Sequence, residues 1–277
     1  MYIKNIFKYL LFIFFIFIVS CSSISQKKIE PKKIYPLTTL YKQAYQYFEE
    51  GNFNQALKIF EIVEKDYSYT EWAPKSLLMR AFMNYESANY IETLVLLQRF
   101  KKRYPGNKNI DYVEYLTAIC LFEQINFISM SQENTELAKK QFNKIIKNYP
   151  NTSYATDSKF KMDLINEQFA GKEMYLARYY AKREKWVPAL YRLNNILKNY
   201  QTTIYVEEAL HRLVEINYKI GNISSAKKYA SILGHNFNQS DWYKNSYRII
   251  EDKNFVYEKE KQKKTLKEKI LQLIPMK

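Results

Sequence analysis

The feature that most constrains the fold is a pattern of small residues that recurs about five times along the chain. In its simplest form, two small residues stand twelve positions apart, a turn residue lies between them, and a further apolar residue follows. The five copies contain Ala44, Gly51, Ala56 and Phe60; Ala81, Ala88, Thr93 and Leu97; Ala118, Ala138 and Phe142; Ala177, Glu184, Ala189 and Leu193; and Val214, Gly221, Ala226 and Ala230. No copy is large enough to bury its own apolar faces, so neighbouring copies must stack.

The pattern resembles the tetratricopeptide repeat, a helix pair of about 34 residues whose small residues stand where the helices cross. We therefore predict an all-α fold, a right-handed superhelix of about five helix hairpins. The repeats are expected at approximately 37–69, 70–107, 108–152, 153–202 and 203–237. In the third copy the small residues are eight positions further apart, which predicts an insertion near Asn126–Thr135. Only 5 glycines and 7 prolines are present, too few for the frequent turns of a barrel or sandwich.

The N-terminus has the pattern of an export signal. Lys4 and Lys8 precede an apolar run over residues 9–19, which is shorter than the about 20 residues of a membrane-spanning helix. The following Ile18-Val19-Ser20-Cys21 resembles the bacterial lipobox, with a plain secretory signal as the alternative. We predict a signal peptide at 1–20, diacylglyceryl and N-acyl groups on Cys21, and a polar tether over 21–36. Several acyl chains on one residue would anchor the protein stably in a membrane.

Five stretches carry a more specific resemblance, at residues 40–57, 100–119, 149–163, 170–190 and 206–221. Together, and above all IDYVEYL (110–116) and AGKEMYLARYY (170–180), they resemble the BamD family, lipoproteins of the β-barrel assembly machinery. The resemblance implies an outer-membrane lipoprotein facing the periplasm, in accord with Ser22 rather than aspartate after Cys21. Its implied partners are the periplasmic domains of the insertase BamA, other Bam lipoproteins and unfolded outer-membrane proteins. It runs from Leu37 to about Leu233 and is expected to extend to Ile249. It implies neither a cofactor besides the lipid nor a nucleic-acid partner.

Two groups of residues are candidates for partner binding. Arg192 matches a family position that faces BamA, although a solvated surface arginine is the alternative. At positions 5, 9 and 12 of the first three repeats stands an aromatic and aliphatic stripe that could grip an extended, alternating outer-membrane strand. Packing between repeats is the alternative for this stripe. Its members are Tyr41, Tyr45, Phe48, Leu78, Phe82, Tyr85, Tyr115, Ile119 and Phe122.

Other chemistry-bearing residues favour structural roles. Cys120 stands in an apolar run and is expected in the core. Glu207 and His211 share a helix face, but two ligands are too few for a metal site, so surface pairing with Glu208 and Arg212 is expected. No catalytic motif is present, and we predict that the chain is not an enzyme. The tail at 250–277 is charged and then amphipathic, and it is expected to cap the last repeat, dock on a partner or lie on lipid.

The formal net charge of +15 leaves alternatives open. A basic balance can indicate nucleic acid or an anionic membrane, but abundant Lys, Asn, Ile, Tyr and Phe with little Gly, Ala and Pro is also typical of AT-rich coding. One rival to the assembly function is another lipid-anchored scaffold, for pilus secretin assembly or envelope constriction. A second is a surface DNA-uptake protein, for which affinity would fall steeply with salt.

Overall fold

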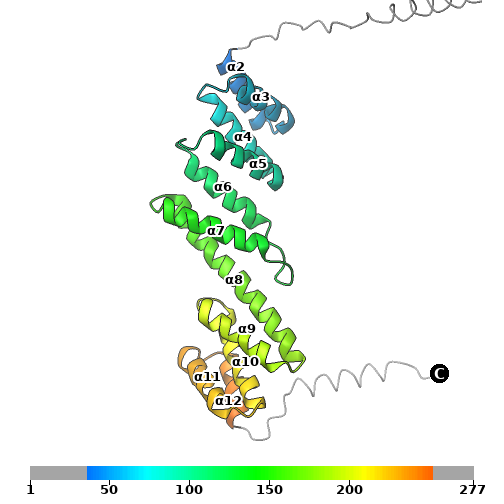
Figure 1. Cartoon of the computed structure of the whole chain (residues 1–277), viewed down its shortest axis with the longest axis vertical. Helices are drawn as coiled ribbons and strands as arrows, with labels where there is room; N and C mark the ends of the chain where they lie inside the picture. The colour runs from blue at the N-terminus through cyan, green and yellow to red at the C-terminus, as the bar shows by residue number, and fades with distance from the viewer. Residues whose placement is uncertain (1–35, 252–277) are drawn as a thin grey trace, which may run out of the picture.

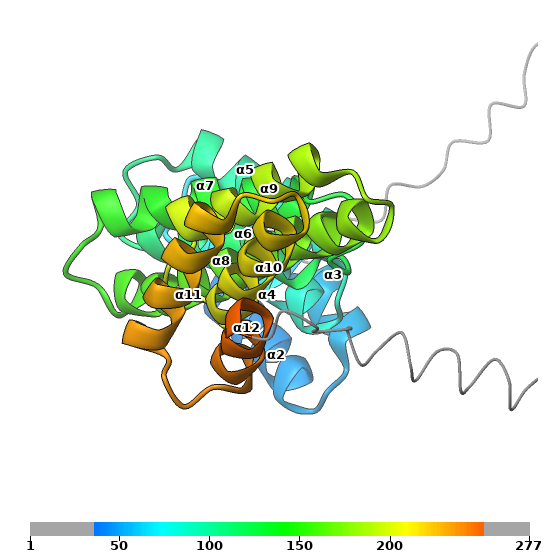
Figure 2. The ribbon, with the colours of Figure 1, turned by 90° about the horizontal axis from the view of Figure 1, so that it is seen from below.

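The computed structural model describes residues 36–251, which form eleven α-helices and no strand (Figure 1). Five helix hairpins follow one another, so the predicted all-helical hairpin fold is confirmed. They are α2 (Leu37–Glu49) with α3 (Phe53–Asp66), α4 (Trp72–Glu86) with α5 (Tyr90–Arg103), α6 (Ile110–Glu123) with α7 (Glu133–Asn148), α8 (Ser153–Lys182) with α9 (Trp186–Asn199), and α10 (Tyr205–Lys219) with α11 (Ile223–Asn236). A single helix, α12 (Asp241–Glu251), packs against α10 and α11. In the end-on view the hairpins gather around one common axis (Figure 2).

The small residues of the repeat pattern lie where helices cross. All ten are buried: Ala44, Ala56, Ala81, Thr93, Ala118, Ala138, Ala177, Ala189, Val214 and Ala226. The large residues that follow in the first four copies, Phe60, Leu97, Phe142 and Leu193, are also buried. A larger side chain at a small position would force the paired helices apart, since protein interiors are close-packed. The repetition in the sequence therefore reflects one packing requirement met five times.

The turns between paired helices share one backbone conformation. Gly51, Ala88, Glu184 and Gly221 have positive φ angles of 74°, 56°, 57° and 81°. These residues occupy the turn positions of repeats one, two, four and five. Gly51 and Ala88 are 37 residues apart, and so are Glu184 and Gly221. A left-handed residue after a helix lets the chain reverse, and glycine adopts that conformation without steric cost. Ala88 and Glu184 adopt it despite their Cβ atoms.

The third hairpin departs from this pattern because it carries the predicted insertion. Residues 124–132 connect α6 to α7 as a loop, in place of the tight turn of the other hairpins. The side chain of Asn134 donates a hydrogen bond to the Gln124 carbonyl (2.9 Å) and holds the two ends of this loop together. The insertion is thus accommodated without disturbing Ala118 and Ala138, which are both buried.

Helix α8 is about twice as long as its neighbours, with 30 residues. Ile165 and Phe169, near its middle, belong to the core of the third hairpin. Its C-terminal half supplies Met174 and Ala177 to a separate core with α9 and α10. One continuous helix therefore belongs to both halves of the molecule, as Figure 1 shows. The sequence interpretation placed this segment in one fifty-residue repeat and did not predict the long helix.

Buried carboxylates join successive hairpins. Each accepts hydrogen bonds from cationic side chains on other helices, so its charge is compensated where it lies out of water. Glu64 on α3 binds Arg80, Arg99 and Arg103; Glu114 on α6 binds Lys101, Gln141 and Lys144; and Glu208 on α10 binds Arg178 of α8 and Arg212. These contacts therefore link neighbouring helices by charge as well as by apolar packing.

Equivalent helix starts are stabilised differently in different repeats. Asn222 caps α11 by accepting a hydrogen bond from the Ser225 amide (3.2 Å). The equivalent Asn52 makes no side-chain cap bond. At that turn Phe53 instead stacks on Phe48, with ring centroids 5.9 Å apart.

Some predictions fall outside the described residues. The signal segment 1–20, Cys21, the tether up to residue 35 and the tail from residue 252 onward are among them. Among helices at residues 36–251, none combines the length and the apolar character needed to cross a bilayer.

Candidate partner-binding surfaces

The aromatic stripe of the N-terminal hairpins lies largely between helices. Tyr41 packs against Phe60 and Trp72, with ring centroids 5.4 and 4.5 Å away. Phe48 contacts Phe82 of the next hairpin at 6.2 Å. Tyr45 is the member that is clearly exposed, at 43%. The other members are partly buried or buried: Leu78, Tyr85, Tyr115, Ile119 and Phe122. Peptide binding by the stripe stays a prediction, and Tyr45 is its most accessible side chain.

Tyr115 illustrates how such a side chain is held. Its hydroxyl donates a hydrogen bond to Asp157 (2.7 Å), and its ring stacks on Tyr154 at 4.9 Å. Burial, followed by the Asp157 carboxylate, raises the pKa of Tyr115 well above its ordinary value of 10.0. The contacts tie α6 to α8, so Tyr115 contributes to packing whether or not it also touches a partner.

Arg192 lies on α9 with an internal partner. Its Nη1 atom donates to both carboxylate oxygens of Glu173 on α8, at 3.1 and 3.3 Å. The guanidinium also lies 5.6 Å from the ring of Tyr191, which is 67% exposed. Arg192 is therefore a positioned, partly buried cation beside an exposed aromatic ring. A contact with a partner carboxylate stays a prediction.

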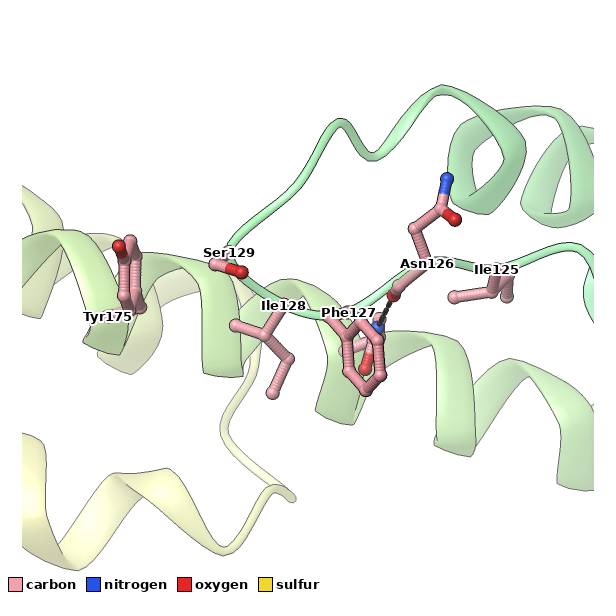
Figure 3. Close-up of a pocket in the computed structure, with 7 residues that line it drawn as sticks. Ile125, Asn126, Phe127, Ile128, Ser129 and Tyr175 are labelled. Carbon is pink, nitrogen blue, oxygen red and sulfur yellow. Dashed lines mark hydrogen bonds between the residues drawn. The ribbon is translucent and has the colours of Figure 1, made fainter.

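The insertion loop forms a surface that the sequence interpretation did not identify. It rests on α8, where Gln168 donates to the Asn126 carbonyl (2.7 Å) and Lys172 donates to the Ser129 carbonyl (2.9 Å). Phe127 is 79% exposed beside a depression of about 590 Å³ that Tyr175 also lines. Figure 3 shows the loop crossing α8 with Phe127 projecting from it.

Exposed apolar side chains continue along α8 on both sides of this loop. They are Phe160, Leu164, Tyr175 and Tyr179. Phe160 and Leu164 are four residues apart, and so are Tyr175 and Tyr179. The two members of each pair therefore lie on one helix face. Large exposed apolar patches on folded proteins usually mark interaction sites. The spacing of these residues is visible in the sequence, but spacing alone does not show whether the helix face that they share is buried or exposed.

His211 is a core residue, contrary to the prediction of surface pairing. It is 1% exposed, and its Nδ1 lies 2.8 Å from the Ser246 hydroxyl on α12. Its ring also packs on Trp242 of α12 at 5.0 Å. Helix α12 covers this face of α10, and that contact between distant segments is not visible in local spacing. Within residues 36–251 no cluster of three or more His, Cys, Asp or Glu residues is arranged to hold a metal.

Glu208 is also buried rather than on the surface. Burial raises its pKa, but hydrogen bonds and charges from Arg178 and Arg212 outweigh burial and lower the pKa below its ordinary value of 4.5. Cys120 lies in the core as expected, fully buried in the cluster around Leu97 and Phe100. Burial raises the pKa of the Cys120 thiol to about 12, which leaves it protonated and inert at neutral pH.

The stacked hairpins, small crossing residues and recurrent left-handed turns define a helical repeat scaffold of the tetratricopeptide type. Residues 35–233 match the family described as YfiO, outer membrane lipoprotein, and the chain belongs to this family. A Caulobacter vibrioides protein named outer membrane protein assembly factor BamD is 37% identical over 84% of this chain and 77% of its own. Proteins of the same name from Rickettsia prowazekii and Neisseria meningitidis serogroup A are 35% and 31% identical. They cover 82% and 76% of this chain, and 90% and 82% of their own.

Among solved structures the likeness is weaker. A tetratricopeptide repeat protein from Parabacteroides merdae aligns with a TM-score of 0.35 at 11% identity, over 77% of this chain and 73% of its own.

Proposed function

We propose that this chain is a non-catalytic subunit of the β-barrel assembly machinery on the periplasmic side of the outer membrane. The observation that carries the proposal is the 37% identity to an outer membrane protein assembly factor, which extends over 84% of this chain. The lipid on Cys21 would hold the repeat domain (37–249) to the membrane through the tether 21–36. The protein would act by binding and positioning other polypeptides, without a cofactor besides that lipid.

The insertase BamA is the first proposed partner, bound through the surface of α9 around Arg192. Support comes from the geometry of this side chain. Glu173 holds the guanidinium through one nitrogen, so other N–H donors can face a carboxylate from outside. Tyr191 beside it offers a large exposed ring, and tyrosine and arginine are the residue types enriched at interface centres.

Unfolded outer-membrane proteins are the second proposed partner, bound by the N-terminal hairpins. Fewer residues support this partner than the full stripe contains. Tyr45 is exposed on α2, whereas Tyr41 and Phe48 are largely occupied by contacts with Trp72 and Phe82. The client segment would therefore meet the rim of the stripe around Tyr45, with the packed rings beneath keeping that surface rigid.

Co-purification with BamA from native membranes tests the first partner. Arg192→Glu should remove most of the BamA, because it places a carboxylate beside Glu173 and opposite the proposed partner carboxylate. Since this change also breaks an internal ion pair, Tyr191→Ala serves as a second variant that leaves the pair intact. Lys198→Glu is the control, an equal charge reversal at an exposed position of the same helix.

Unchanged BamA recovery with both Arg192→Glu and Tyr191→Ala would remove this surface from the proposal. Complete absence of BamA with the unaltered chain would instead favour a different lipid-anchored scaffold. Far-UV circular dichroism of each variant separates loss of binding from loss of the fold.

A further inference from the structure

The second helices of the first two hairpins, α3 and α5, meet at their C-terminal ends. Glu64 of α3 is buried there and accepts hydrogen bonds from Arg99 and Arg103 of α5. The Nη1 atoms of these two arginines lie 3.4 and 3.1 Å from the same carboxylate oxygen. Arg80 of α4 binds the other oxygen. Three guanidinium groups therefore converge on one buried carboxylate.

This junction carries more positive than negative charge. Five cations stand there against three carboxylates, even when Lys101 is left out because it binds Glu114 of α6. The cations are Lys65, Arg80, Arg99, Lys102 and Arg103, and the carboxylates are Glu61, Glu64 and Asp66. Arg99 and Arg103 are also four residues apart on one helix, a spacing at which like charges repel. An anion bound from outside would relieve that repulsion.

The two arginines of α5 can reach such an anion. Their side chains are 39% and 45% exposed, and each contacts Glu64 through Nη1. A guanidinium has five N–H donors in a planar fork, so donors other than those engaged by Glu64 are available on each side chain. This fork matches the geometry of phosphate oxygens. The pair is therefore suited to a phosphate group at the protein surface.

Apolar side chains continue along the exposed side of α5. Ile91 and Val95 are 78% and 45% exposed and stand four residues apart, and the exposed Gln98 and Lys102 follow at helical spacing. Ile62 of α3 is exposed as well. A helix that presents apolar side chains together with cations is typical of proteins that lie in a membrane interface. We call the following residues the α5 face: Ile91, Val95, Gln98, Arg99, Lys102 and Arg103.

The tether keeps this part of the molecule near the membrane, an argument that rests on the lipid anchor of the proposed function. Pro36, where the described structure begins, is 15 residues beyond Cys21. A chain of this length spans at most about 50 Å. Residues 22–35 contain four lysines and one glutamate. Anionic lipid attracts such basic segments beside an anchor, so the tether and the α5 face favour the same kind of surface.

We propose that the α5 face binds an anionic phospholipid surface. Arg99 and Arg103 bind phosphate groups, while Ile91 and Val95 enter the boundary between the headgroups and the acyl chains. The face is then a second membrane contact beside the lipid on Cys21. Together the two contacts determine which side of the superhelix faces the membrane.

A fluorophore at position 98 tests the proposal in the full lipidated chain. The variant Gln98→Cys is labelled there, since Cys120 is buried, and the chain is reconstituted on vesicles. The vesicles contain phosphatidylcholine alone or phosphatidylcholine and phosphatidylglycerol in equal parts. The acrylamide quenching constant should be about twofold smaller on the anionic vesicles, because the label lies against the headgroups. A label at Lys228→Cys, exposed on α11, should give the same constant on both.

Two pairs of changes separate the charged from the apolar part of the face. Arg99→Gln with Arg103→Gln should restore the quenching constant measured on phosphatidylcholine, and Arg80 still compensates Glu64 in this variant. Ile91→Ser with Val95→Ser should do the same without a change of charge. Circular dichroism checks the helicity of each variant.

Each pair has a matched control away from the α5 face. Lys198→Gln with Lys227→Gln removes two exposed cations of α9 and α11. Ile204→Ser with Leu137→Ser changes two apolar residues that are exposed to nearly the same extents as Ile91 and Val95. Neither control should alter quenching at position 98.

Equal quenching at position 98 on the two kinds of vesicle would overturn the proposal, as would protection that neither pair of changes reduces. Equal protection by soluble polyglutamate on phosphatidylcholine vesicles would overturn it in favour of an acidic polypeptide. Flotation with pure phosphatidylcholine vesicles is scored separately. A chain that fails to float lacks the lipid anchor of the proposed function, while protection on the anionic vesicles still reports the α5 face.

Discussion

Replacing Gly221 by alanine should lower the free energy of unfolding by about 1 kcal/mol, because Gly221 has a φ of 81°. An L-residue in left-handed conformation costs about 1–2 kcal/mol relative to the right-handed region. Alanine recovers about 0.4–1 kcal/mol by restricting the unfolded chain. No atom lies within 4 Å of a Cβ built at Gly221, so packing contributes nothing to the difference.

The same argument reverses sign at the two non-glycine turns. Ala88 and Glu184 already carry the left-handed strain, with φ angles of 56° and 57°. Ala88→Gly and Glu184→Gly should therefore each raise the free energy of unfolding, by up to about 1 kcal/mol. If the four turns are equivalent, removing a glycine should lower the free energy of unfolding at each of them, and introducing one should raise it.

Thermal and urea unfolding followed by far-UV circular dichroism measure the series, with midpoints compared between variants because repeat proteins can depart from two-state behaviour. A change of 1 kcal/mol corresponds to a shift of about 2–4 °C in a domain of this size. Gly106→Ala is the matched control, since Gly106 has open space around it and no positive φ. Equal effects of Gly221→Ala and Gly106→Ala, or destabilisation by Ala88→Gly, would refute the reasoning.

Three further outcomes are expected. Cys120, fully buried and with its pKa raised to about 12, should resist iodoacetamide until the chain unfolds; rapid labelling of the folded protein, read by mass spectrometry, would contradict this. The pKa of Glu208 is lowered in the fold, so its contribution is present above the ordinary pKa of 4.5 and is lost as pH falls through the folded value. The stability difference between the unaltered chain and Glu208→Gln should thus shrink on acidification, and a difference independent of pH would count against the Arg178–Glu208 pair. At Gly171, a Cβ would lie 2.7 Å from Ile128 of the insertion loop, so Gly171→Leu should cost roughly 1–3 kcal/mol; a double-mutant cycle in which Ile128→Ala relieves none of this cost would show that the loop is not the cause.

The repeat pattern predicted the fold because its physical cause is local and repeated. Close crossing of two helices admits only small side chains, so the requirement appears in the sequence as Ala44 with Ala56, and Ala177 with Ala189. The turn position was equally readable, even at Glu184, where the residue type gave no support. Position within the repeat, rather than the presence of glycine, identified that turn.

The length of α8 was harder to predict because no sequence motif marks a helix that continues without a break. Residues 153–182 contain no proline and one glycine, Gly171. This absence of turn residues was the only indication of one long helix. The exposed side chains Phe160, Tyr175 and Tyr179 and the insertion loop all lie along this one helix. Their positions could therefore not be predicted without knowing that α8 is continuous.

The candidate site depended on contacts between distant segments. His211 looked like a surface residue because its helix neighbours are charged, and only α12, some 35 residues later, encloses it. The insertion loop likewise contacts α8 through residues far apart in the sequence, as in the hydrogen bond from Gln168 to the Asn126 carbonyl. Spacing along one helix cannot show such a contact.

Because one helix is shared by both halves, the angle between the N-terminal and C-terminal surfaces is set by helical phase. Thirty residues at 1.5 Å each give a rod of about 45 Å, which fixes separation and rotation at once. One residue added near its centre would turn one half against the other by about 100°, whereas four added residues, slightly more than one turn, would leave a rotation of only about 40°. A partner that binds both halves at once would therefore lose one of its two contacts if this rotation changed.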